Sequence, residues 1–217
     1  MAGGGQQEEA RPRTRGPSRE KTARTRAAII AAAMAEFLER GFAAATMASI
    51  ARRAGVAKGT SYLYFETKEA LFAGIVSDVI TNPLGEAEQQ EIGPGESVAA
   101  YIRRTLLPVM ETIEQGGRAA VARLVIAEGA KFPFLIETYR REVYDPFLAH
   151  LGALARRAHA RGEVKDDTLA RHPHLLAAPL WIGMIHNGVI DPLHRVDIAA
   201  LFAAQITLCF GPPEGDG

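Results

Sequence analysis

The sequence predicts an all-α fold, in which a small N-terminal three-helix unit containing a helix-turn-helix precedes a larger helical unit. The composition is rich in alanine, with 47 % apolar and only 7 % aromatic residues, which favours helix over sheet. Apolar residues recur at three- and four-residue spacing, and no useful length of chain alternates with the period of a strand. We expect the small helical unit over residues 21–67 and the larger one over residues 68–217.

Residues 1–20 are predicted to form a disordered basic arm. They are rich in Gly, Pro and charge, and they cannot bury enough apolar surface to offset the entropy of ordering. The distribution of charge along the chain is also uneven. Residues 1–80 hold 12 Lys and Arg against 8 Asp and Glu, although the net charge of the whole chain is zero. The excess of positive charge in residues 1–80 indicates that only this part meets a polyanion, although a basic arm is often only a solubilising tail.

Several classes of protein are not supported by the sequence. The single cysteine, Cys209, excludes an internal disulfide framework and a multi-cysteine metal site. The N-terminus lacks the apolar core of a signal peptide, and no window reaches the ~18 apolar residues of a membrane span. We therefore expect a cytoplasmic protein that makes no contact with a membrane. No nucleophile, base and acid stand together in a catalytic pattern, so no enzymatic activity is expected.

The first four helices follow from local signals. An apolar stripe over Thr22–Arg40 predicts the first helix, which Gly41 ends; its members are Ala28, Ile29, Ala32, Ala33, Phe37 and Leu38. Thr46 caps a short helix over Met47–Ala54. A turn over Gly55–Ala57 leads to a third helix, Lys58–Tyr64. Thr67 caps a fourth helix to about Ile80, and Asn82-Pro83 is expected to end it.

The remaining helices are bounded by Gly, Pro and capping residues. Residues 81–96 are predicted to be an acidic loop. The expected helices after it are Ser97–Gln115, Arg118–Ala130, Pro133–Arg161, one from about Asp166 to Val189, and one from Asp197 to Gly211. Pro108, Pro146 and Pro179 are expected to kink three of them. Helices that bend pack imperfectly along their length, which favours a cavity between them.

The segment Thr46–Lys68 has the helix-turn-helix pattern, two short helices joined by a tight turn that contains glycine. Gly55 can adopt the left-handed backbone of that turn. Ala51 allows the two helices to approach closely, and Ile50 and Val56 are placed to seal them. The second helix of such a pair lies in the major groove of DNA, with its N-terminal residues nearest the bases.

The pattern G-V-A-K-G-T-x-Y-x-Y-F-x-x-K-x-x-L, from Gly55 to Leu71, resembles the DNA-binding domain of the tetracycline-repressor (TetR/AcrR) family. The resemblance covers about residues 22–76. It implies DNA contacts at matching positions: Thr46 and Lys68 to phosphate, and Lys58, Gly59, Thr60, Tyr62 and Tyr64 to bases and backbone. It also implies a homodimer on a double-stranded, pseudo-palindromic operator, and a helical ligand-binding and dimerisation domain over 68–217.

Ser61 departs from the pattern, because an apolar residue is expected where it stands, packed toward the first helix of the pair. A buried hydroxyl costs free energy unless it is hydrogen-bonded. We expect it to donate to the carbonyl of Ala57. Ser61 also supports the alternative interpretation, a helical small-molecule- or metal-binding protein that does not bind an operator.

The effector of such a regulator is expected to be an unknown, largely apolar small molecule. Tyr101, Tyr144, Trp181 and His186 are the candidate lining of its cavity, although any of them can equally be core, and His186 can lie at the dimer interface. The sequence shows no cluster of charge suited to a multiply charged ligand. No cofactor or metal is expected, since His172-Pro173-His174 is the closest approach to a ligand set.

The last helices are expected to pair with their copies in a four-helix interface, as the family resemblance implies. Four apolar residues, Leu201, Phe202, Ile206 and Phe210, fall near one stripe of the final helix. We expect this stripe to form the dimer seam.

Overall fold

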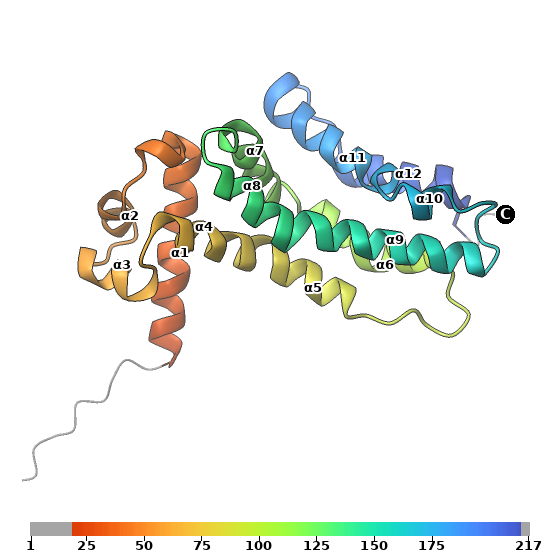
Figure 1. Cartoon of the computed structure of the whole chain (residues 1–217), viewed down its shortest axis with the longest axis horizontal. Coiled ribbons are helices and arrows are strands. Elements are labelled where there is room, and N and C mark those ends of the chain that lie inside the picture. Colours follow the sequence, from red (N-terminus) through yellow and green to blue (C-terminus); the bar gives the residue numbers. More distant parts are fainter. Residues whose placement is uncertain (1–18, 214–217) are drawn as a thin grey trace, which may run out of the picture.

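The computed structural model describes residues 19–213, and every regular element within this range is helical. Figure 1 shows an elongated molecule with a small N-terminal unit at one end and a larger bundle beside it. The N-terminal helices are α1 (Arg19–Ala44), α2 (Met47–Arg53), α3 (Lys58–Tyr64) and α4 (Lys68–Val76). The boundaries predicted for α3 are confirmed, and those for α2 differ by one residue. Of the arm predicted over residues 1–20, residues 1–18 lie outside the described residues, whereas Arg19 and Glu20 were wrongly assigned to it because they begin α1.

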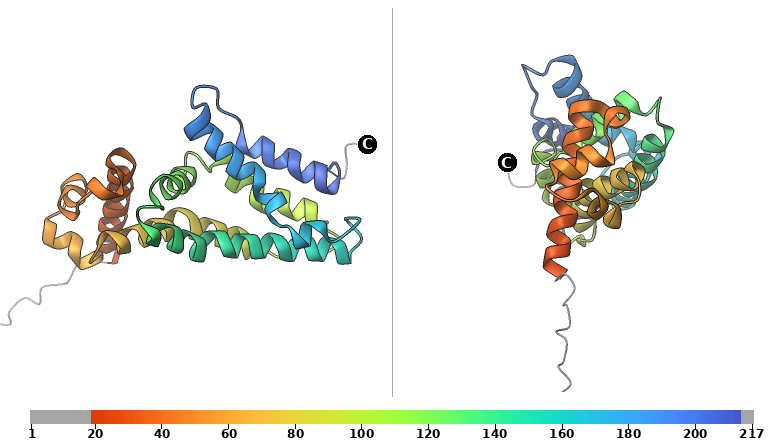
Figure 2. Two further views of the ribbon diagram at one scale, coloured as in Figure 1. Left: turned by 45° about the horizontal axis from the view of Figure 1, so that its top comes forward. Right: turned by 90° about the vertical axis from the view of Figure 1, so that its left-hand side faces the viewer.

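The larger unit contains eight further α-helical segments and three five-residue π-helical segments. They are η1 (Ser77–Thr81), α5 (Asn82–Glu88), α6 (Val98–Glu111), α7 (Arg118–Glu128), α8 (Pro133–Tyr139), η2 (Arg140–Tyr144), α9 (Asp145–Ala160), α10 (Thr168–Arg171), α11 (His174–Ile185), η3 (His186–Ile190) and α12 (Ile198–Phe210). Helices α11 and α12 lie on one flank of the bundle (Figures 1 and 2). No helix within residues 19–213 is both long and apolar enough to cross a bilayer.

Prolines do not stop two of these helical runs, which corrects the expected break at Asn82-Pro83 and the expected loop after it. The chain stays helical from α4 through η1 and α5, and likewise from α8 through η2 and α9. In each run a π-helical segment ends two residues before the proline, at Thr81 before Pro83 and at Tyr144 before Pro146. The wider π turn accommodates the missing backbone N–H, so helix α4 extends into the bundle.

Pro179 leaves a carbonyl free inside α11, and a side chain satisfies it. Proline cannot donate to the carbonyl of Leu175, four residues earlier. Gln205 on α12 donates from Nε2 to this oxygen at 3.1 Å. This hydrogen bond joins α11 to α12 close to Pro179.

The apolar stripe of α1 is only partly as predicted. Ile29, Ala32, Ala33 and Phe37 are buried, whereas Ala28 and Leu38 are exposed. Gly41 breaks the helical backbone, with φ 77° and ψ 161°. The break turns Phe42 into an aromatic cluster with Phe132 and Phe134, at ring-centroid distances of 5.2 and 5.0 Å. This cluster joins the N-terminal unit to the start of α8.

Candidate nucleic-acid interface and effector cavity

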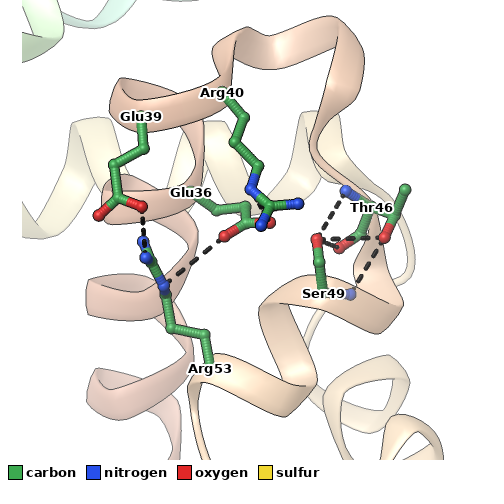
Figure 3. Close-up of polar contacts among 6 residues, drawn as sticks. All are labelled: Glu36, Glu39, Arg40, Thr46, Ser49 and Arg53. Carbon is green, nitrogen blue, oxygen red and sulfur yellow. Dashed lines mark hydrogen bonds and ion pairs between the residues drawn. The ribbon is translucent and has the colours of Figure 1, made fainter.

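Helix α2 begins with a capping box built by Thr46 and Ser49 (Figure 3). The Thr46 hydroxyl accepts from the backbone N–H of Ser49 at 3.0 Å, and Ser49 Oγ accepts from the backbone N–H of Thr46 at 3.1 Å. Two backbone donors that a helix end leaves unpaired are thereby satisfied. The predicted cap at Thr46 is confirmed, and its side chain lies exposed at the N-terminus of α2.

A carboxylate from α1 holds α2 in place (Figure 3). Glu36 is buried and lies 3.4 Å from Arg40 Nε and 3.6 Å from Arg53 Nε. Arg53 also pairs with Glu39, and the hydrogen bond from the Arg53 guanidinium lowers the pKa of the Glu39 carboxyl. Arg53 is therefore engaged in fixing the helix-turn-helix, whereas Arg52 is exposed and forms no ion pair within residues 19–213.

The turn between α2 and α3 has the geometry that the sequence predicts. Gly55 adopts a left-handed backbone with φ 69°, and Val56 donates its backbone N–H to the carbonyl of Ala51 at 3.0 Å. Ile50 and Ala51 are buried at the contact between the helices. The turn thus sets the angle between α2 and α3, the two short helices at the N-terminal end of the molecule in Figure 1.

Ser61 is fully buried in α3, and its hydroxyl is satisfied. The expected acceptor was wrong: Ser61 Oγ donates to the carbonyl of Lys58 at 2.8 Å and not to that of Ala57. The bond reaches three residues back, so it closes within the first turn of the helix. The departure at Ser61 therefore adds a local bond to α3 and leaves no unpaired group in its packing.

The outward face of α3 carries most of the predicted contact residues. Lys58, Gly59 and Tyr62 are exposed, while Thr60 and Tyr64 are half-buried. Of the two tyrosines of α3, Tyr64 is the one that packs against the core. Leu63 was not among the predicted contact residues, yet it is 85 % exposed on the same helix. The sequence offered one sign of this position, a leucine among the polar residues predicted to contact DNA.

The fold does not require glycine at position 59. Its φ is not positive, and a Cβ built on it would meet no atom within 4 Å. Helix propensity disfavours glycine at such a position by about 1 kcal/mol relative to alanine. A glycine that folding does not need leaves room for close approach of another molecule.

Lys68 opens α4 but is already engaged within the protein. Its Nζ donates to the carbonyl of Phe42 at 2.7 Å and lies 4.6 Å from the centroid of the Phe42 ring. Its ammonium has a further donor, so a phosphate contact remains a prediction. In this structure Lys68 ties the start of α4 to the chain that follows Gly41.

An apolar cavity of about 50 Å³ lies inside the larger unit. Tyr144 and Trp181 line it as expected, and their rings meet at a centroid distance of 5.8 Å. The complete lining is Ile80, Leu84, Val109, Met110, Ile113, Arg118, Tyr139, Val143, Tyr144, Phe147, Leu148, Leu180, Trp181 and Met184. The cavity therefore draws on η1, α5, α6, α7, α8, η2, α9 and α11.

Two predicted lining residues lie elsewhere. Tyr101 is buried on α6 with its ring 6.5 Å from that of His150, outside this cavity. His186 approaches the carbonyl of His194 with Nε2 at 3.0 Å, at the far end of α11. Both residues were predicted to line the cavity from their residue types alone. The direction in which each side chain points also depends on its rotational position around the helix and on the bend of that helix.

Among the described residues, Arg118 is the one charged side chain that lines the cavity, and sequence reasoning missed it. Burial lowers the pKa of its guanidinium. Nη2 donates to the carbonyl of Val109 at 2.9 Å and to Thr112 Oγ1 at 2.5 Å. A lone arginine in a sequence carries no sign of burial, so only its position at the start of α7 reveals it.

Two family models match the two parts of the chain. The model for bacterial regulatory proteins of the tetR family matches residues 29–75, and the one for the tetracyclin repressor-like C-terminal domain matches residues 94–204. Among solved structures, Salmonella enterica GusR is similar with a TM-score of 0.63 at 24 % identity, covering 87 % of this chain and 96 % of that one. A transcriptional regulator from Rhodococcus sp. Rha1 gives 0.62 at 20 % identity, covering 85 % and 95 %.

Curated relatives agree with the family models. The repressor BepR of Brucella suis is 42 % identical, with 80 % of this chain and 83 % of that protein covered. The regulator UidR of Escherichia coli K12 is 27 % identical, covering 79 % and 85 %. The chain spans about half the length of Bacillus subtilis YdgC, at 34 % identity, with 44 % of this chain and 48 % of YdgC covered. The chain therefore belongs to the tetracycline-repressor family of bacterial regulatory proteins.

Proposed function

We propose that this chain is a homodimeric repressor that leaves its operator when a small molecule binds in the larger unit. Residues 21–67 read DNA, and residues 68–217 dimerise and bind the effector. The observation that best supports this proposal is the position of the cavity. Ile80 and Leu84 line it, and both lie on the helical run that continues α4. The name of the Brucella suis relative, a transcriptional repressor, supports repression.

The DNA contacts follow the exposed face of the helix-turn-helix. The N-terminus of α3 carries Lys58, Gly59 and Thr60 toward base edges, and Tyr62 and Tyr64 reach bases and backbone. Thr46 at the start of α2 and Lys68 at the start of α4 contact phosphate, as helix N-termini favour. Leu63 adds an apolar contact suited to a thymine methyl group.

The effector acts by widening the cavity. A volume of about 50 Å³ is well below the ~300–1,000 Å³ of ordinary small-molecule sites, so the cavity must widen to hold a ligand. A bound molecule displaces Ile80 and Leu84, and the continuous run carries this displacement to α4. The spacing of two α3 helices in a dimer then changes, and operator affinity falls by the ligand's differential affinity for the two conformers.

Selection from a random pool of double-stranded DNA tests the operator prediction. We expect enrichment of a pseudo-palindrome whose half-sites lie about one helical turn, roughly 34 Å, apart or slightly further. Gel-shift titrations of the enriched DNA against a scrambled duplex then measure specificity. Equal affinity for both duplexes at every salt concentration would contradict the proposal.

Gly59→Ala separates folding from DNA binding. The new methyl group meets no protein atom within 4 Å and removes a helix-disfavouring glycine, so the free energy of unfolding is expected to rise by up to about 1 kcal/mol. Operator affinity is expected to fall, on the order of tenfold, because the methyl group keeps α3 away from DNA. Thermal melting and gel shift measure the two effects, and unchanged operator affinity would remove Gly59 from the interface.

A further inference from the structure

Arg118 carries a buried positive charge that no other described residue neutralises. Its side chain is only 9 % exposed, and no carboxylate within residues 19–213 forms an ion pair with it. Glu114, the acidic residue nearest to Arg118 in the sequence, instead forms ion pairs with Arg123 and Arg195, each at 2.9 Å. A buried charge without a counter-charge is costly, and proteins normally avoid it.

The donors of Arg118 are also incompletely used. A guanidinium has five N–H groups, and the hydrogen bonds of Arg118 within the described chain come from Nη2 alone. Nε is buried and has no partner. A charged group in this state is prepared to receive acceptor atoms from a molecule that enters the cavity.

The remainder of the cavity is apolar or aromatic. Trp181, Tyr144 and Phe147 supply ring surface, and Met110, Leu180 and Met184 supply aliphatic surface. Tyr139 adds a buried ring whose hydroxyl forms no hydrogen bond within residues 19–213, and burial raises the pKa of this hydroxyl. The site therefore combines one cationic point with an apolar wall.

We propose that the effector is an organic monoanion, a carboxylic acid with an apolar body, whose carboxylate binds Arg118 and whose body packs against Trp181 and Tyr144. This inference rests on the proposed effector function and keeps its apolar ligand, with a single negative charge added. A carboxylate suits the site because its two oxygens match guanidinium N–H donors and its one charge matches the single cation. A phosphate dianion would leave a charge unneutralised in the same wall.

The position of Arg118 strengthens the attraction for an anion. It is the first residue of α7, and no acidic residue lies in the first turn of that helix. The partial positive charge of a helix N-terminus therefore adds to the charge of the guanidinium. Arg118 also binds the end of α6 through Val109 and Thr112, so a ligand that pulls on it shifts α6 against α7.

Trp181 makes the test direct, because it is the only tryptophan of the chain and lines the cavity. Its fluorescence is titrated in the full-length protein with octanoate and 4-phenylbutyrate, and with the primary amides of the same two acids. We expect each acid to bind about 10- to 100-fold more tightly than its amide, as hydrogen bonds to a charged partner imply. Equal affinities, or no response to either acid up to about 1 mM, would overturn the inference.

Two variants assign the preference to Arg118. Arg118→Met removes the charge and retains an apolar chain, and it is expected to abolish the preference for acid over amide. Arg118→Lys retains the charge and is expected to keep part of it. The control is Arg140→Met, which removes an exposed arginine of η2 that pairs with Asp145; the preference for acid should be unchanged. If the Arg118→Met variant does not melt cooperatively, the comparison of acids with amides in the unaltered protein still decides whether the site prefers a carboxylate.

Release of operator DNA separates this inference from the proposed function. Acids that bind Arg118 but release no DNA would leave the ligand assignment standing and contradict the effector function. Amides that bind as well as the acids and release DNA would support the effector function and contradict the role of Arg118.

Discussion

Replacing Gly41 by alanine is expected to destabilise the protein by about 2–6 kcal/mol, out of a typical total of about 5–15 kcal/mol. The backbone at Gly41, with φ 77° and ψ 161°, is in a region that costs other residues about 1–3 kcal/mol. The added methyl group would also lie 2.5 Å from Glu128 Oε1. That carboxylate accepts the backbone N–H of Phe42 at 3.0 Å from each oxygen, so moving it leaves the N–H unpaired at a further cost of about 1–3 kcal/mol.

Thermal melting of a glycine series checks the two causes. For a chain of this size the midpoint of Gly41→Ala is expected to fall on the order of 10 °C. Gly55→Ala is the matched control, because Gly55 has φ 69° but a Cβ there meets nothing within 4 Å. It should lose only the backbone term of about 1–2 kcal/mol. If the two variants melt alike, Glu128 does not hold the end of α1 to α7.

The sequence predicts the helix-turn-helix closely because its signals are local. Thr46 caps α2, Gly55 turns the chain, and both features depend on residues within one helical turn. Prolines were less informative. Pro83 and Pro146 were expected to break or kink helices, but π-helical segments precede both and keep the runs continuous. The extent of α4 into the bundle was missed for this reason.

The apolar cavity could be predicted only in its general character. An apolar space with Tyr144 and Trp181 follows from apolar helices interrupted by prolines. The charge of Arg118 does not, because nothing near residue 118 in the sequence shows that α7 begins against the end of α6. Arg118 and its partners Val109 and Thr112 come together only when Gly116-Gly117 reverse the chain.

The dimer seam shows a further limit of sequence patterns. Helix α12 is apolar on most sides, so the spacing of Leu201, Phe202, Ile206 and Phe210 did not tell inward from outward faces. Phe202 and Ile206 are fully buried within their own subunit, which makes their assignment to the seam wrong. Leu201 faces outward, and Leu208 joins it seven residues later at 83 % exposure.

Exposed apolar residues on α12 and on the adjoining helical run take the place of the predicted stripe. Leu201 and Leu208 lie on α12, and three exposed residues at seven-residue spacing lie on the adjoining α11 and η3: Leu175, Ile182 and Val189. The two helices pack against each other on one flank of the bundle (Figure 2). Two such helices from each of two copies form a four-helix interface with twofold symmetry, and we propose this surface as the dimer seam.

Leu208→Glu is expected to convert the protein to a monomer without unfolding it. The side chain faces solvent within one subunit, so folding is unaffected, whereas in a twofold interface the charge is buried unpaired and once from each copy. Loss of the second half-site should weaken operator binding by about 10²–10⁴-fold. Light scattering and gel shift measure the two effects. Leu38→Glu places the same charge at an exposed leucine of α1 and should remain dimeric. Phe202→Glu should instead unfold the subunit, and a dimeric Leu208→Glu protein would place the seam on another surface.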